Sequence, residues 1–385
     1  MKFRVGDTVN VYVGEEFTPG CSGVVQHAMK DGESIIYQLV DSLTWWPEAQ
    51  LKRKYTHISP SGLSLFDKDV QEFYMKYVAR YKPPSIPQTR PMSIGSAFDA
   101  YTKSHIIDTL KKNTDERYQF ESLFKAQVEE HNRETGKVHG LHAFEQYKQS
   151  GALADIMLEI VQGDIEPKFE FDVKDYVKHS DGHVPLAGKP DMFYKNKHGH
   201  FVINDWKVNG YYGKSNTSPK PGYVMCRDGW VTGNRSKNHR CAHKDAQIVN
   251  VGGVLVNMAC KMEDIDRDWA TQLATYAWLM GCEIGSDFIA GIEQLACSYG
   301  ESDGKPNIRV ASFRCKISKD FQFEVYQRYL KCYRALSSGI FFPELDRLQN
   351  DMKCLEMEKM AQTLNPTGDA NEDWFNNMNR GHRNF

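Results

Sequence analysis

Two acids and a lysine stand near the middle of the chain, in the segment GKPDMFYKNKHGHFVINDWKVNG. They are Asp191, Asp205 and Lys207. If the segment is a β-hairpin, side chains alternate between its two faces, so Asp205 and Lys207 share one face. Carboxylates that hold a metal ion beside a lysine are one arrangement that supports phosphodiester hydrolysis. The alternative is an exposed hairpin decorated with charges that never meet.

The hairpin register decides whether the two acids can meet. We take the letters NKHGH, residues 196–200, as a five-residue loop, which sets Lys195 opposite Phe201 and Asp191 opposite Asp205. Directly opposed residues have Cβ atoms about 4.5–5.5 Å apart, where like charges are destabilising. A divalent cation would offset that repulsion, and hard oxygen ligands suit Mg²⁺ or Mn²⁺.

The same residues resemble a known signature. Pro190-Asp191 followed by Asp205-Trp206-Lys207 is similar to the PD-(D/E)XK motif of the restriction-endonuclease-like nuclease superfamily. The resemblance implies an α/β fold, with a core of mixed β-sheet flanked by helices. It also implies that both acids and the backbone carbonyl of Trp206 hold the metal, and that Lys207 helps to generate the attacking hydroxide.

Flanking segments resemble the RecB-like, phage-type exonuclease branch of that superfamily. The run ISPSGLSLFDKDVQEFYMKYV is similar to its opening helix. Glu170 matches an upstream acid that supports the metal site, and Gln272 and Tyr276 match a Q-xxx-Y helix motif. At positions i and i+4 these last two share a helix face, from which they could contact the phosphate or Lys207. Where the branch often has a histidine this chain has Asp99, either a substitute metal ligand or a solvated helix residue.

The nine cysteines predict no further metal. They are irregularly spaced without a CxxC pair, which favours a reducing compartment over a disulfide framework. Iron–sulfur members of the branch have a cysteine near the first helix and a later group of three. This chain has neither, so we expect no iron–sulfur cluster. We expect no zinc either, because the spacing of Cys226, His239, Cys241 and His243 fits known zinc sites poorly.

A basic segment follows the hairpin, at about residues 208–250. From Lys207 to Lys244 the chain has eight Lys or Arg and one acid, with tyrosine and tryptophan interleaved. Cations for phosphates and rings for unpaired bases are what a nucleic-acid groove needs. A solvated loop is the alternative. The candidate DNA-binding residues are Lys214, Lys220, Arg227, Arg235, Lys237, Arg240 and Lys244.

Length and composition frame these motifs. A chain of 385 residues predicts roughly two to three domains. We expect a small all-β SH3-like barrel at 1–54, a nuclease domain with a basic insertion at 55–340, and a C-terminal helix with a polar mobile tail at 341–385. The net charge of −2 means that any DNA contact must come from a local basic region. No signal peptide or apolar run near 18 residues is present, so we expect a cytoplasmic protein without membrane contact.

These observations predict a function and leave alternatives. The first expectation is a Mg²⁺- or Mn²⁺-dependent deoxyribonuclease, an exonuclease acting on DNA ends in phage replication or recombination. In it Asp191, Asp205, Lys207, Glu170, Gln272 and Tyr276 form the catalytic set. DNA and a single-strand annealing or replication protein are the candidate partners, in a bacterial or phage-infected host cytosol. The alternatives are a structure-specific or nicking endonuclease of the same fold and a non-catalytic DNA-binding or assembly protein.

Overall fold

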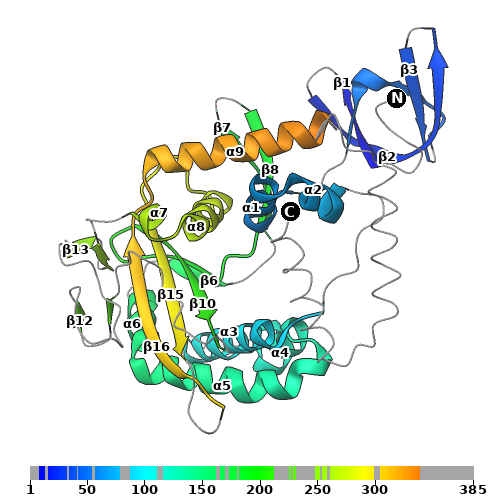
Figure 1. The fold of residues 1–385 in the computed structure, drawn as a ribbon. Helices are drawn as coiled ribbons and strands as arrows, with labels where there is room; N and C mark the ends of the chain where they lie inside the picture. Colours follow the sequence, from blue (N-terminus) through cyan, green and yellow to red (C-terminus); the bar gives the residue numbers. More distant parts are fainter. Residues whose placement is uncertain are drawn as a thin grey trace, which may run out of the picture. The chain divides into compact units, whose positions relative to one another are not determined.

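The computed structural model forms two compact units, each built from separate stretches of chain (Figure 1). One unit comprises Met1–Pro84, Lys174–Ala187 and Glu324–Gln362, and the other Ser85–Val173, Gly188–Phe323 and Thr363–Phe385. The structure describes residues 8–13, 16–32, 34–40, 42–53, 57–78, 87–110, 116–161, 165–169, 173–179, 182–211, 225–226, 229–230, 248–251, 254–257, 261–298 and 304–338.

The first unit begins with a five-stranded antiparallel sheet in the order β4-β3-β2-β1-β5. Its strands are β1 (Thr8–Val13), β2 (Glu16–Asp31), β3 (Ser34–Leu39), β4 (Trp45–Pro47) and β5 (Leu51–Arg53), with a 3₁₀ turn at Glu48–Gln50. The alternating Val9 and Val11 are buried with Tyr37 and Leu51 in a small apolar core, because alternate residues of a strand point to one face. The described part of residues 1–54 is thus predominantly β-strand, and the likeness to an SH3 barrel stays a prediction.

The same unit continues with short helices and a two-stranded sheet. These are α1 (Pro60–Lys68), α2 (Val70–Phe73), a π-helical turn (Tyr74–Val78), β7 (Val173–His179) and β8 (Gly182–Gly188). The Ser59 hydroxyl caps α1 by accepting a hydrogen bond from the Gly62 N–H at 3.1 Å. Ile58 pairs with the β8 backbone, donating to the Pro185 carbonyl at 2.8 Å and accepting from Ala187 at 3.0 Å.

The second unit is organised around a seven-stranded mixed sheet in the order β12-β11-β16-β15-β10-β9-β6. Its strands are β6 (Ile165–Phe169), β9 (Met192–Lys195), β10 (Phe201–Asn209), β11 (Met225–Cys226), β12 (Gly229–Trp230), β15 (Ile289–Ser298) and β16 (Asn307–Cys315). Strands β10 and β15 are parallel, whereas β15 pairs with β16 and β9 pairs with β10 and β6 in antiparallel fashion. A separate two-stranded sheet contains β13 (Ile248–Val251) and β14 (Val254–Asn257).

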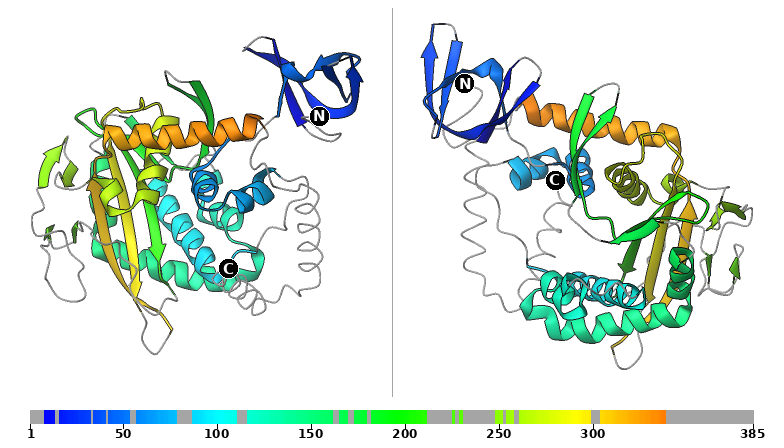
Figure 2. Two further views of the ribbon diagram at one scale, coloured as in Figure 1. Left: turned by 45° about the horizontal axis from the view of Figure 1, so that its top comes forward. Right: turned by 180° about the vertical axis from the view of Figure 1, so that it is seen from behind.

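Helices cover both faces of this sheet (Figures 1 and 2). One face has α3 (Arg90–Thr109), α4 (Phe120–Gln127), α5 (Arg133–Ser150) and α6 (Ala152–Val161), with 3₁₀ turns at Glu116–Tyr118 and Glu130–Asn132. The other face has α7 (Met262–Ile265) and α8 (Arg267–Leu279), and the chain continues from β16 into α9 (Lys319–Ser338). The even-numbered β10 residues Val202 and Trp206 are buried against Phe98 and Tyr147, while Phe313 of β16 contacts Trp269 of α8.

Helices α3 and α5 approach each other unusually closely. A Cβ atom built on Gly140 of α5 would lie 2.5 Å from the Ala97 Cβ and 3.1 Å from the α3 backbone. Only glycine, which has no Cβ, allows this approach. The contact fixes the spacing between the two helices at the middle of α3.

The architecture agrees with the predicted class. A mixed α/β protein with several sheets and with helices on both faces of the main one is consistent with a restriction-endonuclease-like core. Among the described residues, no helix combines the length and the apolar composition needed to cross a membrane.

Candidate active site

The hairpin of β9 and β10 has the register that the sequence predicts. Phe201 pairs with Lys195, and the ladder continues to Asn204 opposite Met192. Asp191 is the next residue, where the chain bends away from the ladder. Its Oδ2 accepts a hydrogen bond of 3.0 Å from the backbone N–H of Trp206. The hairpin therefore brings Asp191 beside Asp205, as expected from the sequence.

The two acids form a buried pair with opposite protonation tendencies. The Asp205 side chain is only 3% exposed and that of Asp191 is 20% exposed. Burial and the adjacent Asp191 charge raise the pKa of Asp205 well above its ordinary value. Burial opposes ionisation of Asp191, but the ammonium of Lys103, a hydrogen bond with Asp205 and the charge of Lys207 hold its pKa below the ordinary value. The pKa values of the two acids are therefore shifted in opposite directions, that of Asp205 upward and that of Asp191 downward.

Lys207 extends from the same strand face as Asp205. Its Nζ forms an ion pair with Asp205 Oδ2 and donates a hydrogen bond of 2.9 Å to Oε1 of Gln272. Burial alone would lower the pKa of Lys207, but the charges of Asp205 and Asp191 raise it. Lys207 is therefore a charged donor in this state, suited to stabilising negative charge.

Helix α8 positions Gln272 and Tyr276 over this face. Its N-terminus is capped by Asp266, whose Oδ1 accepts from the Trp269 N–H at 2.9 Å. One turn apart, Gln272 Nε2 donates to the Tyr276 hydroxyl at 2.8 Å. Gly188, just before the hairpin, admits the tyrosine ring, because a Cβ there would lie 2.6 Å from Cε1 of Tyr276. Lys207, Gln272 and Tyr276 thus form a continuous chain of hydrogen bonds.

A second lysine, which the sequence reasoning missed, reaches the acids from the opposite face. Lys103 of α3 has a fully buried side chain, with Nζ 2.8 Å from Asp99 Oδ2 and 3.2 Å from Asp191 Oδ1. Asp99 Oδ2 also accepts from Gln127 Nε2 at 3.0 Å. The i, i+4 spacing of Asp99 and Lys103 was an available signal, since such pairs interact on a helix. In the described contacts Asp99 supports Lys103, and its role as a metal ligand stays a prediction.

Trp206 stands between Asp205 and Lys207 in the sequence, and its side chain is buried on the α3 face of the sheet. Its indole N–H donates to the Tyr147 hydroxyl at 3.2 Å, and both side chains are buried. Opposite Trp206 in the parallel register is Glu293, which accepts from Arg314 at 2.6 Å and from Ser312 at 2.5 Å. These polar contacts in the core hold the strand, and with it the Trp206 carbonyl, in one position.

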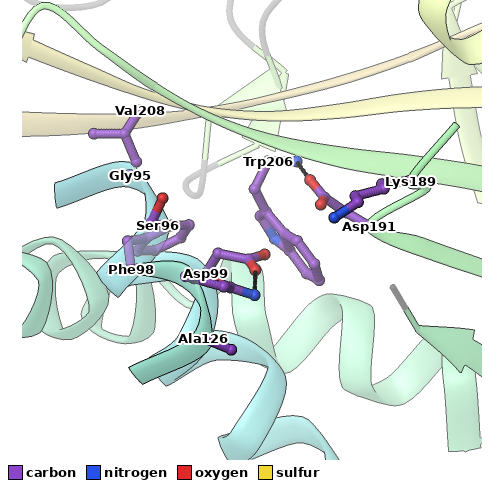
Figure 3. Close-up of a pocket in the computed structure, with 10 residues that line it drawn as sticks. Gly95, Ser96, Phe98, Asp99, Ala126, Lys189, Asp191, Trp206 and Val208 are labelled. Carbon is purple, nitrogen blue, oxygen red and sulfur yellow. Dashed lines mark hydrogen bonds between the residues drawn. The ribbon is translucent and has the colours of Figure 1, made fainter. Parts of the chain in front are cut away.

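A cavity of about 440 Å³ opens beside Asp191 on the α3 side of β10. Figure 3 shows Asp99 of α3 facing this space, with Asp191 and Lys189 on the segment before β9 and Trp206 on β10. The dashed line between Trp206 and Asp191 is the backbone hydrogen bond described above. Asp191 therefore borders the cavity, whereas Asp205 does not.

The residues present fit a divalent metal ion. Oδ2 of Asp205 is buried, lies against Lys207 and has no well-formed hydrogen bond within the described part of the chain. Two adjoining carboxylates are hard oxygen donors of the kind that Mg²⁺ and Mn²⁺ prefer. No group of three or more His, Cys, Asp or Glu residues able to hold a metal is found among the described residues.

Several predicted site residues lie outside the described residues. Glu170 directly follows β6 and is one of them. The others are Lys214, Lys220, Arg227, Arg235, Lys237, Arg240 and Lys244 of the basic segment and His239, Cys241 and His243 of the rejected zinc set. Their roles stay predictions.

Comparison with known proteins supports the nuclease superfamily. A family model described as the PD-(D/E)XK nuclease superfamily matches residues 57–221, which include Asp191, Asp205 and Lys207. The match supports the superfamily expected from the motif and suggests a nuclease, whose substrate would be DNA. Nucleases of this superfamily typically use divalent metals.

Other comparisons add little. A solved structure titled "Crystal structure of SSO0001" is similar over 62% of this chain and 74% of that one, at 9% identity and a TM-score of 0.21. That likeness is too low to carry an argument. Comparison with curated proteins gives no match.

Proposed function

We propose that this protein is a metal-dependent deoxyribonuclease that hydrolyses phosphodiester bonds at DNA ends. The observation that carries the proposal is the convergence of Asp191, Asp205 and Lys207 at one end of the β9–β10 hairpin. The chemistry of these groups matches the superfamily suggested by residues 57–221.

We assign each residue a role in this proposal. Asp191, Asp205 and the Trp206 carbonyl would hold one or two Mg²⁺ or Mn²⁺ ions, helped by Glu170. A divalent cation supplies a water of lowered pKa and charge neutralisation at the phosphate. Lys207, as a charged donor, positions the attacking water or stabilises the negative charge that builds on the phosphate. Gln272 and Tyr276 hold the Lys207 ammonium in place through their hydrogen bonds.

The preference for DNA ends rests on the RecB-like pattern around the motif. Within the Q-xxx-Y pair, Gln272 accepts a hydrogen bond from Lys207 and donates one to Tyr276, which supports this proposal. We therefore propose an exonuclease of phage replication or recombination, cytoplasmic, with a single-strand annealing or replication protein as partner. The basic segment at 208–250 would guide DNA to the site, and residues 1–54 would form an SH3-like accessory barrel beside a nuclease domain at 55–340.

Linear and covalently closed circular DNA separate the candidate activities. Purified protein is incubated with each substrate in Mg²⁺, in Mn²⁺ and in EDTA, with the Lys207→Ala variant as a control for contaminating nucleases. We expect linear DNA to be degraded only with metal, and closed circles to survive.

Other outcomes identify the alternatives. Cutting of closed circles would establish an endonuclease and contradict the preference for ends. No cleavage of either substrate with any divalent metal would contradict the nuclease proposal and leave a DNA-binding or assembly protein.

A further inference from the structure

Lys103 has a fully buried side chain, which is rare for a lysine and occurs almost only when the ammonium is paired with an opposite charge. Its side chain is 0% exposed, yet it comes from the middle of α3 and reaches the acid pair across the face of the sheet. Its ammonium lies between Asp99 Oδ2 at 2.8 Å and Asp191 Oδ1 at 3.2 Å. A buried cation between two carboxylates has its position closely defined.

The contacts of Asp191 show what this cation does. One carboxylate oxygen accepts from Lys103 and the other accepts from the Trp206 backbone N–H at 3.0 Å. An ionised carboxylate has about four lone-pair sites. Lys103, the Trp206 N–H and the hydrogen bond with Asp205 use three of them, so one remains for a further ligand. The two donors come from different elements, α3 and β10, and together they fix the orientation of the carboxylate plane.

The other end of the contact chain holds Lys103 itself. Asp99, one turn earlier on α3, accepts from Lys103, and Gln127 at the end of α4 donates to the same Asp99 oxygen at 3.0 Å. Gln127, Asp99, Lys103 and Asp191 therefore form a continuous chain from α4 through α3 to the hairpin. Such supports of a metal-binding carboxylate orient it and raise metal affinity.

We propose that Lys103 is a positioning residue that orients Asp191 for a divalent cation, with Asp99 and Gln127 as its supports. The inference rests on the proposed metal-dependent function and adds a second lysine, on the opposite face of the sheet from Lys207. Lys103 acts through Asp191 and does not contact the phosphate. Asp99, in this assignment, supports the lysine and is not itself a ligand.

Direct metal binding tests the assignment without relying on cleavage. Mn²⁺ is titrated into the full chain without DNA, and free Mn²⁺ is followed by electron paramagnetic resonance. We expect Lys103→Met, a neutral side chain of similar length, to weaken Mn²⁺ binding by about 10–100-fold. Lys103→Arg, which keeps the cation, should recover part of that loss. Lys137→Met is the matched control, since Lys137 pairs with Glu121 on the exposed surface of the same unit at 3.3 Å.

Asp99→Asn separates positioning from direct ligation. If Asp99 acts through Lys103, this isosteric change should weaken Mn²⁺ binding less than Lys103→Met does, by about 3–10-fold. A larger loss from Asp99→Asn than from Lys103→Met would make Asp99 a ligand and overturn the proposal. If Lys103 variants do not fold, Asp99→Asn decides alone, and either unchanged binding or a loss beyond about 100-fold contradicts it.

The wild-type titration distinguishes the two levels of inference. Mn²⁺ binding and cleavage by wild type, with equal or tighter Mn²⁺ binding by Lys103→Met, would overturn the role of Lys103 and leave the nuclease proposal standing. Absence of both Mn²⁺ binding and cleavage in the wild-type protein would overturn the nuclease proposal and this inference together.

Discussion

Each face of the central sheet carries a lysine that contacts one of the two acids Asp191 and Asp205, but one lysine is partly exposed and the other is fully buried. On the α8 face, Lys207 is 23% exposed, donates a hydrogen bond to Gln272 and forms an ion pair with its strand neighbour Asp205. On the α3 face, Lys103 is fully buried between two carboxylates that are far apart in sequence. A partly exposed ammonium can turn toward an incoming phosphate, whereas a buried one cannot leave without uncovering unpaired charge. Under the proposed function, this difference places the chemistry on the α8 face and the support on the α3 face.

Among the proposed variants, Asp205→Asn should have the largest effect on activity, because Asp205 pairs with Lys207 and also contacts Asp191. Loss of a metal-binding carboxylate should reduce kcat/KM by at least about 10³-fold, the upper end of losing one transition-state contact. The asparagine amide can still donate to Asp191 and accept from Lys207, so folding should be retained. Steady-state cleavage of linear DNA measures the loss.

The same variant should raise stability in metal-free buffer. The native pKa of Asp205 is raised, so between the unfolded value and the native one the folded state binds more protons. Stability contributed by that proton is therefore lost as pH rises through this window. Asparagine does not titrate, so the Asp205→Asn variant does not lose stability over this pH range. Above the native pKa of Asp205, the Tm of the variant should exceed that of wild type by about 2–4 °C for each kcal/mol of stability regained. Thermal unfolding in EDTA, followed by circular dichroism at a series of pH values, tests this prediction. A lower Tm for the variant than for wild type would contradict a raised pKa of Asp205.

Lys207→Ala should reduce kcat by at least about 10²-fold, on the scale of removing one electrostatic contact to the transition state. Because Lys207 is partly exposed, the variant should fold and keep a Tm close to that of wild type. Lys316→Ala is a suitable control, since Lys316 is similarly exposed and pairs with Asp287 away from the acids. Full cleavage rate in Lys207→Ala would show that the α8 face does not perform the chemistry.

Tyr276→Phe should have a smaller effect, about 10-fold on kcat. The hydroxyl accepts from Gln272, which in turn accepts from Lys207, so its loss loosens the lysine without removing it. One lost hydrogen bond of about 1.4 kcal/mol corresponds to that factor. Single-turnover cleavage measures it, and an effect as large as that of Lys207→Ala would place Tyr276 in direct contact with substrate.

Tyr147→Phe should have the smallest effect on catalysis, only a few-fold. It removes the buried partner of the Trp206 indole N–H on the α3 face and should cost about 1–3 kcal/mol of stability. Denaturant unfolding and cleavage rate together test it. A loss of activity much larger than a few-fold would show that the Tyr147 hydrogen bond also holds the Trp206 carbonyl in the position that catalysis requires.

On the α8 side of the site, the groupings within one hairpin or one helix could be predicted from sequence, whereas the contact of Lys207 with Gln272 spans 65 positions and was suggested by the family resemblance. A constant-sum register sets Asp191 beside Asp205, strand alternation groups Asp205 with Lys207, and helical spacing groups Gln272 with Tyr276. Each rule uses only positions within one hairpin or one helix. The mixed α/β class, in contrast, was expected from the resemblance to the nuclease superfamily.

The α3 half could not be predicted in the same way. Lys103 meets Asp191 across 88 positions of sequence, and Gln127 meets Asp99 across 28. Those contacts depend on how α3 and α4 pack on the sheet, which no local rule supplies. The i, i+4 pairing of Asp99 with Lys103 was visible, but it resembles the many solvent-exposed pairs on helices.

The glycine contact between α3 and α5 has a consequence at a distance. Gly140 sets how far α3 stands from its neighbour, and α3 carries both Asp99 and Lys103. A single methyl group at position 140 would act as a wedge and displace the whole helix. Gly140 contacts neither acid and has no side chain. It nevertheless affects the charge environment of Asp191, because the spacing that it allows determines where α3 and Lys103 lie.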